Sequence, residues 1–129
     1  MLSSVALAAA FYIAWANFGR RRHALTWALA YVVGALQFGA TLSAQSFPSE
    51  TSYLLTENAL AILFVTLGVR GHCQRTNCTQ LPLSPLVLGG IVYLVSAALV
   101  IAYPHAGLVH AVVPAYAAIA LLVLSLIHI

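Results

Sequence analysis

Residues 2–43 read LSSVALAAAFYIAWANFGRRRHALTWALAYVVGALQFGATLS. This stretch contains two apolar runs, 2–18 and 24–43, with Gly19 and a cluster of three Arg and one His between them. Each run has about the length that an α-helix needs to cross the hydrocarbon core of a bilayer. Because only a tight turn can join the two runs, we predict that they form an antiparallel pair of membrane helices.

The rest of the chain repeats this alternation of apolar runs and polar connections. The later connections lie at 44–52, 71–80 and 104–107. The later apolar runs lie at 53–69, at about 86–103, and in a final segment that contains Pro114 and ends at Ile129. We therefore predict an all-α fold, a polytopic membrane helix bundle with about five transmembrane helices.

The composition of the chain excludes several classes of function. Hydrophobic residues make up 63% of the 129 residues and charged residues 5%, whereas soluble domains contain about 25% charged residues. The charged residues are five Arg and two Glu, so the chain has no Lys and no Asp. We therefore expect neither paired-carboxylate catalysis nor an Asp cluster that binds phosphate or metal. Hydrolysis or phosphoryl transfer by this chain alone is not expected either.

The charges are distributed unevenly among the connections. The Arg residues all lie in the first and third connections, and they are Arg20, Arg21, Arg22, Arg70 and Arg75. Cytoplasmic loops carry an excess of Arg and Lys, so we interpret these residues as topology anchors on the cytoplasmic side. The N-terminus, the 44–52 loop and the 104–107 turn then lie outside. We expect a multi-pass protein of the bacterial inner membrane, with the lipid bilayer as its partner. The pI of 9.2 reflects this orientation and not a nucleic-acid partner.

The last six residues, 124–129, read LSLIHI. The codons CTG TCT CTT ATA CAC ATC encode this string, and they occur in a transposase adapter used to prepare sequencing libraries. The final apolar run also has no polar tail to anchor it at the cytoplasmic face. A membrane helix rich in Leu and Ile can match such a string by chance. We predict that residues 1–123 form the membrane module and that a natural C-terminal part is missing.

Three polar residues within the apolar runs are candidates for ligand sensing. Glu57 is ionisable, and a charge inside a membrane is costly enough to indicate function by default. Together with Asn58 it could bind a cation, a proton or a polar ligand. The alternative is that Glu57 is wetted at the outer interface, close to the loop that contains Glu50. Gln37 lies in the middle of its run, where an amide can instead form an interhelical hydrogen bond.

Two sets of His and Cys residues are candidate ligands of a metal or haem. His72, Cys73 and Cys78 form an H-C-x4-C pattern that offers three ligands to one metal ion, although a structural zinc site needs a fourth. The alternative is that the two Cys are free thiols in a reducing compartment. His105 and His110 flank the last connection, but a spacing of five does not place them on one helix face. An interfacial role is the alternative for this pair.

Several stretches together resemble a known membrane region. They are ANFGRRRH at 16–23, LTWALAY at 25–31, and a third run that begins with Glu57-Asn58 and ends in LGVRG at 67–71. This pattern resembles the multi-helix N-terminal membrane regions of bacterial GGDEF proteins, the diguanylate cyclases. In those proteins an Arg-rich turn precedes a Trp-containing helix, and an Asn-bearing third helix ends in Arg-Gly. The resemblance covers nearly the whole chain.

The resemblance implies a membrane sensor or anchor for a signalling protein. A cytoplasmic output domain would follow the last helix, form a homodimer and make cyclic di-GMP from two GTP. The GGDEF signature and its metal-binding carboxylates are absent from the sequence, so no catalytic residue is carried over and no cofactor is expected. Asn58, Arg70, Gly71 and the turn at 20–22 match the pattern, and the resemblance gives them roles in packing and topology.

Two other functions fit the sequence. The first is a small transporter or one half of a transporter, although no internal repeat supports this reading. The second is a membrane subunit that holds haem or a metal through His or Cys ligands. A transporter predicts a complete gene and substrate flux, whereas a cofactor subunit predicts visible absorbance in the purified protein.

Overall fold

The computed structural model describes residues 2–17, 19, 21–76, 84–103 and 107–127. These described residues form five α-helices and one 3₁₀ helix and contain no β-strand, which confirms the all-α prediction. The α-helices are α1 (Leu2–Asn17), α2 (Arg22–Leu42), α3 (Glu50–Thr76), α4 (Pro85–Ala102) and α5 (Gly107–Ile127), and the 3₁₀ helix η1 is Ala44–Ser46.

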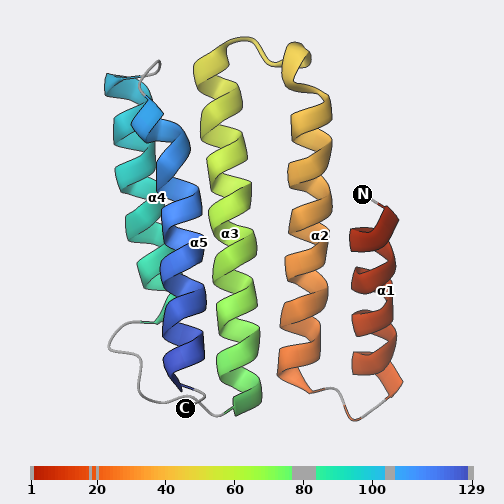
Figure 1. Cartoon of the computed structure of the whole chain (residues 1–129). Helices are drawn as coiled ribbons and strands as arrows, with labels where there is room; N and C mark the ends of the chain where they lie inside the picture. Colours follow the sequence, from red (N-terminus) through yellow and green to blue (C-terminus); the bar gives the residue numbers. More distant parts are fainter. Residues whose placement is uncertain (1, 18, 20, 77–83, 104–106, 128–129) are drawn as a thin grey trace.

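The third helix lies at the centre of the bundle. Figure 1 shows α2 on one side of α3 with α1 beyond it, and α4 and α5 on the other side. Consecutive helices run antiparallel, so the predicted α1–α2 hairpin is confirmed. Gly19, in the connection between α1 and α2, has a φ of 84°. This left-handed conformation is open to Gly and disfavoured for residues with a Cβ.

Three helices in the described part of the chain are long and apolar enough to cross a membrane, and they are α2, α3 and α4. The 16 residues of α1 and the segment Ala111–Leu122 of α5 form shorter apolar helices. Helices of this kind suit a membrane protein. Whether α1 and α5 also span the bilayer stays a prediction.

The distribution of side chains is the reverse of that in a soluble bundle. Most of the buried side chains are small, and among them are Ala8, Ala24, Ala28, Ala30, Ala61 and Ala120. Large apolar side chains are exposed on every helix, for example Leu2, Leu36, Leu63, Leu94 and Leu121. In water such a surface would be a large apolar patch, whereas lipid tails solvate it well. Small residues between the helices let the backbones approach closely.

The start of α3 differs from the prediction. The helix begins at Glu50 and not at Tyr53, so Glu50 belongs to its first turn and not to a loop. The Ser49 N–H donates to Ser52 Oγ at 3.2 Å, and the Ser52 N–H donates to Ser49 Oγ at 3.1 Å. This reciprocal capping satisfies backbone donors that have no partner within the helix.

The end of α3 also differs from the prediction. The helix runs to Thr76, so the loop predicted for 71–80 is wrong for 71–76. A Gly costs a helix about 1 kcal/mol relative to Ala, so Gly71 disfavours this continuation when only the local sequence is considered. Gly71 is instead buried against the indole of Trp27 on α2. That contact stabilises a helical backbone at this position, because the indole occupies the space of a side chain.

The charged residues lie at opposite ends of the bundle. Arg21 and Arg22 lie at the start of α2, while Arg70 and Arg75 lie in the last turns of α3. Because α2 and α3 are antiparallel, these four residues share one end of the structure, below called the Arg end (Figure 1). The start of α3 carries both Glu residues and lies at the other end. Arg20 lies outside the described residues.

Candidate functional site

One face of α3 carries a buried stripe in which polar and apolar side chains alternate. Leu54, Asn58, Ile62 and Thr66 recur at intervals of four residues, which places them on one side of the helix. Their exposed fractions are 2%, 8%, 3% and 2%, so all four are buried. This stripe faces α4 and α5.

The stripe meets α4 in an antiparallel register. The Asn58 amide donates from Nδ2 to Ser96 Oγ at 2.9 Å, and Ser96 is 1% exposed. The three pairs that define the register are Leu54 with Val100, Asn58 with Ser96, and Thr66 with Gly89. Asn58 and Ser96 are therefore hydrogen-bond partners between two helices, as polar groups away from water require.

Thr66 joins α3 to two helices at once. Its hydroxyl lies 2.9 Å from the Tyr116 hydroxyl of α5, and either oxygen can be the donor. On α4, a Cβ at Gly89 would overlap Thr66 Oγ1, so only Gly lets the two backbones come this close. Thr66, Gly89 and Tyr116 thus form a junction of three helices, below called the Thr66 junction.

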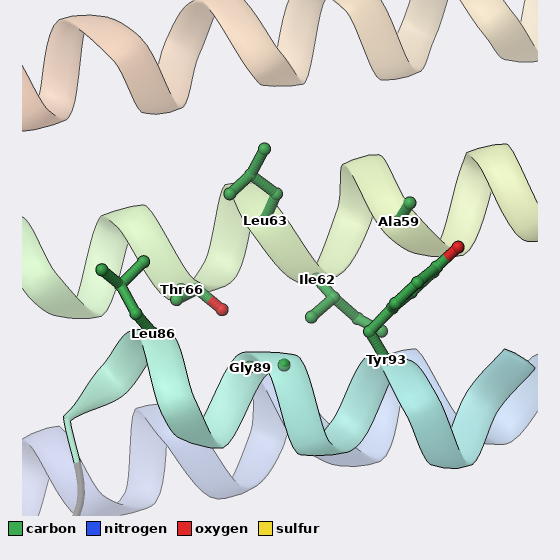
Figure 2. Close-up of a pocket in the computed structure, with 8 residues that line it drawn as sticks. Ala59, Ile62, Leu63, Thr66, Leu86, Gly89 and Tyr93 are labelled. Atoms are coloured by element: carbon green, nitrogen blue, oxygen red, sulfur yellow. The ribbon is translucent and has the colours of Figure 1, made fainter.

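A pocket of about 250 Å³ lies beside this junction, between α3 and α4. Figure 2 shows Ala59, Ile62, Leu63 and Thr66 on α3, with Leu86, Gly89 and Tyr93 facing them from α4. Gly90 completes the lining. Most of the wall is apolar, and Thr66 contributes a hydroxyl to it. We refer to this space as the α3–α4 pocket.

At the Arg end, α2 and α3 are held together around Trp27. The Gly71 backbone lies against its indole, and the Arg75 guanidinium lies 5.8 Å from its ring centroid, in cation–π range. The Thr26 hydroxyl donates to Gln74 Oε1 at 2.8 Å. Aromatic rings continue from here across three helices, namely Phe11, Tyr31 and Phe64. Arg75, predicted as a topology anchor, therefore also contributes to packing.

The structure separates the three candidate sensing residues. Asn58 faces α4, whereas half-buried Glu57 interacts with the Tyr53 hydroxyl one turn earlier on α3. Successive helical residues point about 100° apart, so Glu57 and Asn58 contact different neighbouring residues. Gln37 is half-buried on α2, and no side-chain hydrogen bond among the described residues reaches its amide. Glu57 and Asn58 therefore have different interaction partners, and the role of the three residues in ligand sensing stays a prediction.

The predicted metal ligands lie partly outside the described residues. His72 and Cys73 belong to the last turns of α3, while Cys78 and His105 are not described, nor is the side chain of His110. Among the described residues, no three His, Cys, Asp or Glu side chains lie close enough together to hold a metal ion. The sites that involve Cys78, His105 or His110 stay predictions.

Thr66, Ser96 and Tyr116 were not predicted as site residues. Their signal in the sequence is a hydroxyl group within an otherwise apolar run. Thr66 lies eight residues after Asn58, and this spacing places both on one helix face. Periodicity could therefore have identified the polar residues of the buried stripe on α3. It could not have identified the partners, because they depend on how α4 and α5 dock.

Replacing Asn58 by Ala is expected to lower the free energy of unfolding by about 1–2 kcal/mol, since it leaves the buried Ser96 hydroxyl without its donor. The double-mutant cycle with Ser96→Ala should give a coupling energy of about 1 kcal/mol. SDS titration in mixed micelles, followed by circular dichroism, measures both quantities. Asn17→Ala is the control, because the Asn17 amide is exposed and bonds its own helix at Ile13. A coupling energy of zero would contradict the Asn58–Ser96 bond.

The chemistry that the described site offers is hydrogen bonding and apolar space. Its polar groups are one amide and three hydroxyls, which belong to Asn58, Ser96, Thr66 and Tyr116. Hydroxyl groups are weak nucleophiles unless a neighbouring base activates them, so this arrangement suits binding and helix positioning. The chain matches no protein-family model, no curated protein and no solved structure.

Proposed function

We propose that the chain is a membrane-embedded sensor or anchor module of a bacterial signalling protein. The observation that carries this proposal is the attachment of the central helix, α3, to α4 and α5 through two buried polar contacts on one face. A few such contacts can be exchanged for others when a helix shifts. The shifted and unshifted helices are two arrangements of the module. A ligand or a bilayer state that favours one arrangement would then raise its population relative to the other.

The proposed orientation places the Arg end in the cytoplasm and the N-terminus outside, with five spans in the bacterial inner membrane. Its support is the gathering of Arg21, Arg22, Arg70 and Arg75 at one end of the helices, which the positive-inside rule assigns to the cytoplasm. Helix α5 runs toward this same end (Figure 1). A domain placed after α5 would therefore lie in the cytoplasm, and we propose a GGDEF-type diguanylate cyclase that dimerises there.

Two exposed positions at opposite ends test the orientation. In a background of Cys73→Ser and Cys78→Ser, we expect a membrane-impermeant maleimide to label Ser46→Cys in intact spheroplasts. It should label Thr76→Cys only in inverted vesicles, because Ser46 precedes α3 and Thr76 ends it. The opposite labelling would reverse the proposed orientation. Labelling of both positions from one side would contradict a spanning α3.

The gene sequence beyond the codon for Val123 shows whether the proposed cytoplasmic output domain follows the membrane module. Amplification from source DNA past the codon for Val123 is expected to reach a GGDEF-type domain in the same reading frame. Expression of that full-length protein should then raise cyclic di-GMP in cells. A stop codon after Ile129, with substrate flux in vesicles, would favour the transporter instead. Visible absorbance that is lost in His105→Ala or His110→Ala would favour the cofactor subunit.

Replacing Glu57 by Gln tests its role in sensing. Gln keeps the shape of the side chain and an acceptor for the Tyr53 hydroxyl, so expression and folding in the membrane should be retained. The signalling response of the full-length protein should change, because the charge at this depth is lost. The matched control is Glu50→Gln, an exposed carboxylate in the first turn of the same helix. Equal responses of both variants and the wild type would mean that Glu57 is a wetted interfacial residue.

A further inference from the structure

The Thr66 junction contains one more hydroxyl proton than the hydrogen bonds formed there require. Thr66 and Tyr116 each carry one O–H, and the single bond between their oxygens, 2.9 Å long, consumes one of the two protons. Thr41, Thr56 and Thr76 donate to the carbonyl four residues earlier, but the structure shows no such bond at Thr66. No second acceptor contacts either hydroxyl among the described residues. One donor at the junction is therefore left over whichever oxygen donates.

The α3–α4 pocket lies next to this junction, and the spare proton belongs to Thr66 when the Tyr116 hydroxyl is the donor of their bond. Thr66 is part of its lining, and the remaining wall is formed by Ala59, Ile62, Leu63, Leu86, Tyr93 and two Gly residues. The volume of about 250 Å³ exceeds the roughly 150 Å³ of an engineered apolar cavity that binds benzene. A buried donor without an acceptor is costly, so the site favours an occupant that supplies one.

We propose that the α3–α4 pocket binds a small apolar molecule with one hydrogen-bond acceptor oxygen. The hydrocarbon part of the molecule fills the space between α3 and α4, and its carbonyl or ether oxygen accepts the spare proton at the Thr66 junction. Ligands with an apolar body and few polar contacts are typical of such pockets. The inference concerns binding alone and goes beyond the proposed signalling role, since a transporter would keep the same pocket.

The acceptor oxygen can come from two sources within a membrane. One is a free lipophilic ketone or ether dissolved in the bilayer, and the other is the ester carbonyl of a phospholipid acyl chain. Both present the same chemistry to the Thr66 junction. A bilayer of ether-linked phospholipid lacks the ester carbonyl, so a comparison of ester and ether bilayers distinguishes them.

Photolabelling of the whole chain in nanodiscs tests the proposal. The probe is benzophenone, an apolar ketone that inserts into neighbouring C–H bonds when it is illuminated. Peptic digestion and mass spectrometry should locate the label mainly within 59–66 of α3 and 86–93 of α4. Labelling spread evenly over the exposed faces of all five helices would overturn the proposal.

Two Gly variants distinguish labelling within the α3–α4 pocket from labelling of the lipid-facing surface in general. A Cβ at Gly90 meets no atom within 4 Å, so Gly90→Leu adds a side chain to the pocket lining without a clash at its Cβ. We expect this variant to reduce labelling at least fivefold. Gly39→Leu is the control, because Gly39 is equally unobstructed but lies on α2, away from the pocket. Unfolding of both variants, followed by circular dichroism, shows whether each variant still folds. Equal labelling of folded Gly90→Leu and wild type would refute the site.

Competition with two matched molecules tests the hydrogen bond. At equal concentrations in the bilayer, the ketone 1-tetralone should displace benzophenone about fivefold better than its hydrocarbon analogue tetralin, as one neutral hydrogen bond predicts. Thr66→Val should abolish this preference, and Thr66→Ser, which retains the hydroxyl, should restore it. Equal displacement by the two competitors in the wild type would overturn the acceptor requirement.

The lipid comparison then identifies the source of the acceptor. Equal labelling in ester and ether nanodiscs is expected for a free lipophilic ketone or ether. Labelling that is at least fivefold weaker in ester lipid would also support the acceptor site and identify the phospholipid ester as its occupant.

Discussion

Gly71→Leu is expected to lower the free energy of unfolding by about 2–3 kcal/mol, the upper range for overpacking a well-packed position. A Cβ at Gly71 would overlap the indole of Trp27, so α2 and α3 must separate or Trp27 must leave its place. Either movement also disturbs the cation–π contact of Arg75 and the hydrogen bond between Thr26 and Gln74. SDS titration followed by circular dichroism measures the loss.

Gly68→Leu is the matched control for this prediction. Gly68 lies three residues earlier on the same helix, and a Cβ there meets no atom within 4 Å. Because Leu has a higher helix propensity than Gly, this variant should keep the stability of the wild type or gain up to about 1 kcal/mol. If both variants lost stability equally, the cause would lie in the helix and not in the contact with Trp27.

Gly89→Ala is the second substitution with a large expected effect, a loss of about 1–3 kcal/mol from a single added methyl group. Its Cβ would overlap Thr66 Oγ1, so α4 must move away from α3 or the bond between Thr66 and Tyr116 must break. The neighbouring substitution Gly90→Ala adds the same group in open space, so it should keep the stability of the wild type or gain up to about 1 kcal/mol.

A size swap shows whether the Gly89 effect arises at Thr66. In the double variant Gly89→Ala with Thr66→Ala, the added methyl group occupies the space that the Thr66 side chain leaves. The stability loss of the double variant should therefore be smaller than the sum of the two single losses, by about 0.5–3 kcal/mol. Additive losses would contradict the close approach of α3 and α4 at this level.

The sequence was sufficient to predict the helical class and most helix positions, because apolar runs of membrane length leave few alternatives. The two errors at the ends of α3 have different causes. The start could have been found, since Ser49 and Ser52 have the spacing of a capping box. The continuation through Gly71 could not, because it depends on Trp27, a residue of another helix.

The candidate site was predictable only in part. Asn58 was recognised as a polar residue within an apolar run, but its role as the donor to Ser96 depends on the register of α3 against α4. That register is set by the packing of Leu54 on Val100 and by the space at Gly89, which local patterns do not contain. The α3–α4 pocket has the same origin, because it results from the docking of two separate runs.

The polar stripe of α3 also has a consequence for biosynthesis. Helices α1 and α2 contact each other and leave the ribosome before α3, so this hairpin can enter the bilayer as a unit. When α3 follows, it can dock on α2, but the amide of Asn58 has no partner until Ser96 is synthesised with α4. Lone α3 would therefore expose a costly amide to lipid. We expect α3 to wait beside the translocon until α4 emerges, so the two helices would be released into the bilayer together.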